Sequence, residues 1–230
     1  FTRLGQRIIH LLTAQTNSGQ LYEVDMRLRP SGASGLLVSS LGAFARYQEN
    51  EAWTWEHQAL VRARVLVGSQ DVGQAFEKVR AQVLGKSRDL AKLQQEVSEM
   101  RAKMRDNLGT KSTAAGTAAN AFDATAPFDL KQDAGGIVDI EFMVQYAALA
   151  WSHSHPPLLR WTDNIRILEE LEHEGLMPAE DASLLREAYK AYRSAAHRQA
   201  LQKDAGVIAG DQFAEERRQV LRIWRELGLS

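Results

Sequence analysis

The sequence contains no cysteine and no long hydrophobic run. The missing thiols exclude disulfide bonds, thiolate nucleophiles, iron–sulfur clusters and cysteine-based zinc sites, and their absence is typical of the reducing cytoplasm. No apolar stretch reaches the roughly 18 residues that a membrane span requires, and Phe1-Thr2-Arg3 resembles neither a signal peptide nor a natural start. We therefore expect a soluble cytoplasmic chain that belongs to a longer protein.

An excess of charge of either sign is also lacking. The formal net charge is -1, which does not indicate a nucleic-acid surface over the whole molecule. With 230 residues, of which 44% are hydrophobic and 25% charged, the chain is long enough for one large domain or for a small domain joined to a larger one. We expect neither a nucleic-acid partner nor a membrane partner.

One segment, residues 21–29, alternates between apolar and charged side chains. The apolar positions are Tyr22, Val24, Met26 and Leu28, and the charged positions are Glu23, Asp25, Arg27 and Arg29. A period of two predicts a strand with one packed and one polar side, ended by Pro30. A carboxylate beside two guanidinium groups suits a triphosphate site, with Asp25 on a divalent cation. The alternative is the solvated charged face of an edge or one-sided sheet, which the pattern alone favours.

Helical periodicity dominates the rest of the sequence. It predicts helices over residues 4–12, 41–51, 56–67, 72–84, 90–108, 137–151, 178–202 and 212–227. A further helix, capped by Thr162, is predicted to run to His173. Residues 109–127 contain almost no large apolar side chain, which predicts a flexible linker. The fold class is mainly α, and a single strand needs partner strands from outside these residues.

A second group of charged residues lies in the later helices. Asp139 and Glu141 resemble a metal-binding pair, but on a helix they point about 200° apart. We expect each to meet an arginine or fix a helix junction, with nucleotide contact as the alternative, and assign neither as catalytic. Gly135-Gly136 lacks the lysine of a P-loop. The mixed charges of residues 86–111 predict a solvated or partner-facing helix.

Tryptophan and histidine offer two further candidate sites. Trp53, Trp55 and Trp161 could stack on a base, but tryptophan at helix starts more often packs in a core, which is the expectation here. His153 and His155 precede two prolines, and the spacing places no third ligand beside them. We expect no zinc site there.

Three longer motifs carry a resemblance to a known family. They are YEVDMRLRPSGASGLL (Tyr22–Leu37), KQDAGGIVDIEFMVQY (Lys131–Tyr146) and LLRWTDNIRILEEL (Leu158–Leu171). They resemble the bifunctional glutamine synthetase adenylyltransferase/adenylyl-removing enzymes, in the same order and over nearly the whole chain. SGASG and DIEF look like the C-terminal, adenylylating half of that family.

The resemblance implies a DNA polymerase beta-like nucleotidyltransferase, whose site uses a Gly-Ser turn, two nearby aspartates and a third carboxylate on a later strand. Asp25 matches this third, catalytic and metal-binding position, and Arg27 and Arg29 become candidates for the ATP phosphates. The Gly-Ser turn and the two other aspartates are absent from the chain. The resemblance therefore implies a fragment that is inactive alone.

The implied reaction transfers AMP from ATP to a tyrosine of glutamine synthetase with Mg²⁺ as cofactor, and PII-type signalling proteins are implied partners. The expected organisation is the end of a nucleotidyltransferase α/β domain (1–67), connecting helices (68–108), a flexible linker (109–127) and a C-terminal helical bundle domain (128–230). An alternative function is a docking module, in which the helices after Phe128 bind glutamine synthetase or a PII-type regulator. A third possibility is a scaffold without a ligand of its own.

Overall fold

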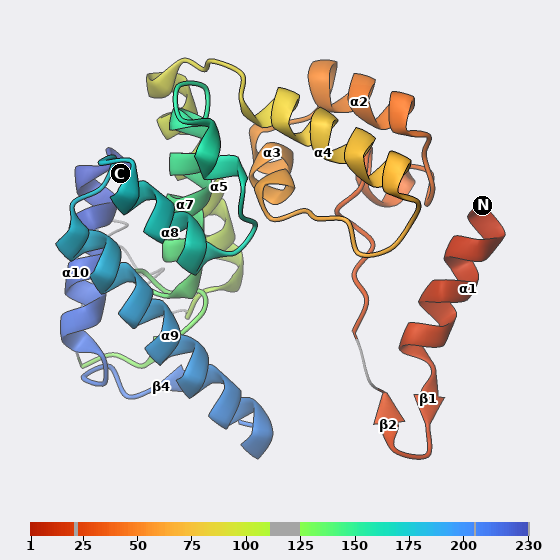
Figure 1. Cartoon of the computed structure of the whole chain (residues 1–230). Helices are drawn as coiled ribbons and strands as arrows, with labels where there is room; N and C mark the ends of the chain where they lie inside the picture. The colour runs from red at the N-terminus through yellow and green to blue at the C-terminus, as the bar shows by residue number, and fades with distance from the viewer. Residues whose placement is uncertain (21–22, 111–124, 205, 230) are drawn as a thin grey trace.

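The computed structural model describes residues 1–20, 23–110, 125–204 and 206–229, which are mainly helical as expected (Figure 1). The α-helices are α1 (Thr2–Thr13), α2 (Leu41–Asn50), α3 (Thr54–Val61), α4 (Gln70–Leu84), α5 (Leu90–Leu108), α7 (Ile137–Trp151), α8 (Asn164–His173), α9 (Ala179–Gln202) and α10 (Ala214–Glu226). Short 3-10 turns cover Gly32–Ser34 (η1) and Pro156–Leu159 (η2). Within the described ranges, no helix is both long and apolar enough to cross a membrane.

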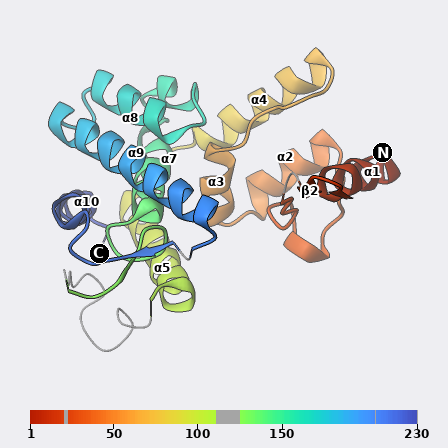
Figure 2. The ribbon, with the colours of Figure 1, turned by 90° about the horizontal axis from the view of Figure 1, so that it is seen from below.

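The helices fall into three groups along the chain. Helices α5 and α7 to α10 form a bundle, α2 to α4 pack beside it, and α1 stands apart on the other side of α2 and α4 (Figure 1). Figure 2 shows α7 inside the bundle, with α5, α8, α9 and α10 around it. Among α2 to α4, helix α3 makes the main contact with the bundle, because it packs on α7 and α5.

Among the described residues, the strands are short and form two separate pairs. The antiparallel pairs are β1 (Gln15–Thr16) with β2 (Gly19–Gln20), and β3 (Phe128–Asp129) with β4 (Val207–Ile208). The strand predicted over residues 21–29 is wrong for the described residues Glu23–Arg29, which have no strand assignment. A strand needs a neighbour for its ladder hydrogen bonds, and none lies beside this segment in the described structure.

Helix α7 is the centre of the core because it is apolar on almost every side. Ile140, Met143, Val144, Ala147 and Ala148, which lie on several sides of this helix, are all fully buried. A helix that is apolar all round must be covered on all sides. The bundle covers it with the buried leucines of α8 and α9, Tyr192 of α9 and Trp224 of α10.

Several predicted helix ends are confirmed and others shift for local reasons. Residues 90–108 are helical as predicted, whereas the helix predicted over 56–67 ends at Val61. The guanidinium group of Arg80 donates to the carbonyls of Leu60 and Val61, which takes the acceptors that a further turn would use. Helix α8 begins after Asp163, whose carboxylate accepts from Arg166 N, so the predicted cap at Thr162 is displaced by one residue.

The predicted linker 109–127 lies largely outside the described residues, which omit 111–124. Its described flanks meet at one buried side chain. Asp133 accepts hydrogen bonds from the backbone N and hydroxyl of Thr110 and from the backbone N of Asp129. The two sides of this segment are therefore held together by a single carboxylate.

Candidate functional site

Asp25, the predicted metal ligand, forms an exposed pair with Arg27. The guanidinium Nη2 of Arg27 lies 2.7 Å from Oδ2 of Asp25, and the backbone N of Arg27 donates to Oδ1 at 2.9 Å. These bonds from Arg27 lower the pKa of Asp25 from 3.8 to about 2. The side chains are 82% and 54% exposed for Arg27 and Asp25, so the carboxylate faces solvent and already has a cationic partner.

A carboxylate oxygen is a suitable ligand for Mg²⁺, but one carboxylate is not a site. In the described parts of the chain, Asp25 belongs to no group of three acidic or histidine side chains close enough to share an ion. Both of its oxygens also accept hydrogen bonds from Arg27. The residues that the structure describes around Asp25 therefore do not make a complete magnesium site.

Arg29, the second arginine predicted to bind phosphate, holds the loop that follows it. Its guanidinium group donates to the carbonyls of Met26, Ala33 and Gly35. Gly35 must be glycine here, because a Cβ atom would lie 1.9 Å from the carbonyl oxygen of Pro30. The motif SGASG thus encodes a compact turn that Arg29 stabilises.

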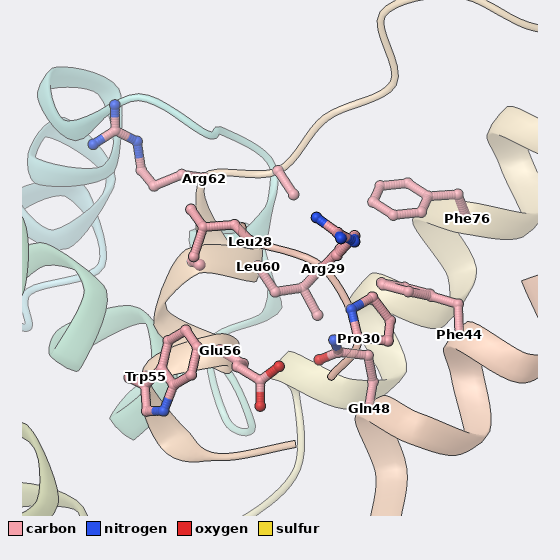
Figure 3. Close-up of a pocket in the computed structure, with 12 residues that line it drawn as sticks. Leu28, Arg29, Pro30, Phe44, Gln48, Trp55, Glu56, Leu60, Arg62 and Phe76 are labelled. Carbon is pink, nitrogen blue, oxygen red and sulfur yellow. The ribbon is translucent and has the colours of Figure 1, made fainter. Parts of the chain in front are cut away.

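A cavity of about 460 Å³ opens beside this turn, between residues 28–30 and helices α2, α3 and α4. Figure 3 shows Phe44 and Phe76 on one side of it and Trp55 on the other, with Leu28 and Leu60 between them. Its remaining lining residues are Arg29, Pro30, Gln48, Glu56, Ala59, Arg62 and Ala63. The cavity is mainly apolar, with polar groups at its edges, which is the usual character of a small-molecule pocket.

Glu56 is the buried charged residue of this cavity, and its carboxylate organises the surrounding helices. It accepts hydrogen bonds from the hydroxyl of Tyr47 on α2 and from the backbone N of Trp53 at the start of α3. Burial, with a contribution from Glu56, raises the pKa of Tyr47. This network was not predicted, although a glutamate three residues after a helix start is a recognised capping signal.

Asp139 and Glu141 meet arginines, as expected, and they do so on different sides of α7. The fully buried Asp139 lies 2.5 Å from Nε of Arg101, which also donates to the carbonyl of Gln132. Glu141 lies 3.5 Å from Nη1 of Arg62 and accepts from the hydroxyl of Tyr189. The prediction of a solvated helix for residues 86–111 is wrong at Arg101, which is fully buried between α5 and α7.

The aromatic and histidine candidates have ordinary neighbours. Trp53 is 70% exposed, which contradicts its expected place in the core, whereas Trp55 lines the cavity and Trp161 packs against the bundle. His155 lies 2.7 Å from Glu174, and His153 lies near the carbonyl of Gly85.

Comparison with known proteins assigns the two ends of the chain. Residues 1–79 match the family described as glutamate-ammonia ligase adenylyltransferase, and residues 98–221 match the family described as GlnD PII-uridylyltransferase. The second match covers more than half of the chain. The chain belongs to the GlnD PII-uridylyltransferase family. This assignment covers α7, α8, α9 and most of α5 and α10.

Curated relatives are similar along the whole chain and share one name, bifunctional glutamine synthetase adenylyltransferase/adenylyl-removing enzyme. The protein of Pseudomonas putida is 84% identical over 230 residues, which are 100% of this chain and 24% of the relative. The proteins of Pseudomonas syringae pv. tomato and Pseudomonas aeruginosa are 81% and 76% identical, again over 100% of this chain and 23% of each relative. The chain spans about a quarter of the length of these relatives.

Proposed function

We propose that this chain is part of an enzyme that transfers AMP from ATP to a tyrosine of glutamine synthetase and releases pyrophosphate, thereby regulating nitrogen assimilation. The observation that carries the proposal is the identity of 84% along all 230 residues with a relative named for this activity. The match of residues 1–79 to an adenylyltransferase family agrees with it. The reaction takes place in the cytoplasm, with ATP as substrate and Mg²⁺ as cofactor.

Within that enzyme, the chain belongs to the C-terminal, adenylylating half, and residues 1–67 end a DNA polymerase beta-like nucleotidyltransferase domain. The motifs SGASG and DIEF support this placement by their resemblance to that half. The relatives are about four times as long as this chain, so the whole protein has room for the two other carboxylates. On this proposal, the 230 residues alone do not catalyse adenylylation.

Asp25 provides one oxygen ligand of the metal in the whole enzyme. An aspartate carboxylate is ionised near neutral pH with or without Arg27 beside it, which suits a metal ligand. Arg27 must then exchange Asp25 for another anion, and a phosphate oxygen fits its planar fork. Arg29 supports the turn behind them and contributes positive charge at the cavity.

Asp25→Asn in the complete enzyme tests this assignment. We expect adenylylation of glutamine synthetase to be lost while the thermal unfolding temperature stays unchanged, because the side chain is exposed and the amide keeps its shape. Asp106→Asn on the exposed face of α5 is the matched control and should keep full activity. Near-normal activity of Asp25→Asn would refute the role of Asp25.

A docking function for the helices after Phe128 is the second candidate, because residues 98–221 match a family named for PII uridylylation. In this case the bundle binds glutamine synthetase or a PII-type signalling protein. A pull-down of each protein with the 230-residue chain, run beside an ATP-dependent adenylylation assay, separates the two candidates. Binding without turnover supports a docking module, and turnover by this chain would contradict its proposed inactivity.

A further inference from the structure

A polar cleft of about 610 Å³ lies between α4 and the segment that leads into α8. Its walls come from the residues after α3, from α4, and from residues 160–166. The lining side chains are Arg64, Glu77, Arg80, Arg160, Trp161, Thr162, Asp163 and Arg166. Four arginines thus face two carboxylates, and the cleft carries an excess of positive charge.

Arg80 forms the frame of this cleft and is not available to a ligand. Its side chain is buried, and its guanidinium group donates to the carbonyls of Leu60, Val61 and Leu159 at 2.8 to 3.1 Å. These bonds tie the end of α3 to the residue that precedes Arg160. The other side chains of the cleft are therefore attached to a fixed backbone, which reduces the entropy lost when they bind.

Trp161 holds two of the remaining arginines in place. The guanidinium carbons of Arg160 and Arg166 lie 4.8 and 4.3 Å from its ring centre, at the distance of a cation–π contact. A guanidinium group that contacts a ring with its face keeps N–H groups at its edge for hydrogen bonds. The tryptophan therefore orients positive charge.

Two arginines of the cleft have unused hydrogen-bonding capacity. Arg64 and Arg160 are exposed, and the guanidinium group of neither forms a hydrogen bond or ion pair with any other residue that the structure describes. Besides its contact with the Trp161 ring, the guanidinium group of Arg166 has a distant carboxylate, with its Nε 3.9 Å from Oδ2 of Asp163. The donors come from two segments that are far apart in the sequence and meet only in the fold.

We propose that this cleft binds a polyphosphate group. Guanidinium forks match the oxygens of phosphate and bind them with two parallel hydrogen bonds, and several forks around one cleft suit a linked chain of phosphates. The guanidinium groups of Arg160 and Arg166 already contact the Trp161 ring, so this ring does not stack on a nucleotide base. The cleft recognises the polyphosphate itself, free or attached to a nucleoside, and this inference does not depend on adenylyl transfer at Asp25.

Calorimetric titration of the 230-residue chain with inorganic tripolyphosphate, without divalent cations, tests the proposal. We expect saturable binding, and the double variant Arg64→Gln/Arg160→Gln should raise Kd by at least about tenfold because it removes two charge-assisted contacts. Arg198→Gln, an exposed arginine of α9, is the matched control for a lost charge. All variants should unfold at the temperature of the wild type. No saturable binding, or equal weakening by Arg198→Gln, would overturn the proposal.

Titrations with two further ligands, ATP and adenosine, show whether the cleft binds the polyphosphate alone or also requires a nucleoside. ATP should bind with a Kd within about threefold of tripolyphosphate, and adenosine should not bind, because the contacts are electrostatic. Asp25→Asn should leave the Kd for tripolyphosphate unchanged, which separates this cleft from the proposed catalytic carboxylate. Tripolyphosphate binding that is unchanged in Arg64→Gln/Arg160→Gln would refute a polyphosphate site in the cleft. ATP binding that persists in this variant while tripolyphosphate binding is lost would place ATP elsewhere and support free polyphosphate as the ligand of the cleft.

Discussion

Two pairs of arginine and aspartate, one in each part of the molecule, have similar contacts but opposite surroundings. Arg27 and Asp25 are 2.7 Å apart and mainly exposed, whereas Arg101 and Asp139 are 2.5 Å apart with side chains 1% and 0% exposed. An exposed pair exchanges readily with water and ions, and a buried pair does not. The same two residue types therefore form an exchangeable surface pair in one case and a fixed contact between helices in the other.

The surrounding regions differ in the same way. Helix α1 has no buried residue, and Leu4, Ile8 and Leu11 on it are exposed, whereas α7 is covered on nearly all sides. Apolar burial is the main source of stability in folded proteins. The bundle is therefore the stable body of the chain, and the residues before α2 contribute little to its stability.

The largest effect should come from breaking the buried pair. Arg101→Leu leaves the Asp139 carboxylate buried without its closest guanidinium group, which should lower the free energy of unfolding by about 3–5 kcal/mol, measured by urea denaturation. The double variant Arg101→Leu/Asp139→Leu should recover part of this loss, because no buried charge remains. Arg198→Leu on the surface is the control. A cost for Arg101→Leu as small as that of Arg198→Leu would show that the pair does not hold α5 on α7.

A smaller effect on the free energy of unfolding should distinguish the bundle from α1 when one leucine in each is replaced. Leu168 on α8 is fully buried and Leu11 on α1 is 71% exposed. Leu168→Ala should lower the free energy of unfolding by about 2–5 kcal/mol, and Leu11→Ala should change it by less than about 0.5 kcal/mol. Comparable losses in urea denaturation would mean that α1 belongs to the same cooperative unit as the bundle.

The bundle could be predicted from the sequence because its helices carry their own signals. The apolar content of α7 and the caps and breaks around α5 and α8 are local, and those helices are placed within a few residues. Arg101 was missed because charge alone was considered, although it continues the spacing of Leu93 and Val97, which are both buried. An arginine in the apolar stripe of one helix, with an aspartate in an apolar helix nearby, is the signal that predicts such a pair.

The candidate site was less predictable, because strand formation depends on neighbours. Alternation over residues 21–29 gives a periodicity but no partner, and the side chains of Asp25 and Arg29 bond to local backbone groups instead. The cavity beside Phe44 and Phe76 and the cleft at Trp161 each join residues from distant segments, which no local pattern indicates. Whether Asp25 binds a metal stays a prediction.

The smallest effect concerns the exposed pair itself and measures how available Asp25 is. Arg27→Gln removes the guanidinium group that lowers the pKa of Asp25, so a carboxyl NMR titration should show this pKa rising from about 2 toward 3.8. A lowered pKa stabilises the native state above the unfolded value, and this contribution is lost as the pH falls from about 4 to 2. The wild type should therefore lose more stability than Arg27→Gln over that interval, and the two should respond alike above pH 5. Arg3→Gln on α1 is the control, and an unchanged pKa in Arg27→Gln would mean that the pair does not persist in solution. The carboxylate would then be free to bind a cation without first exchanging a partner.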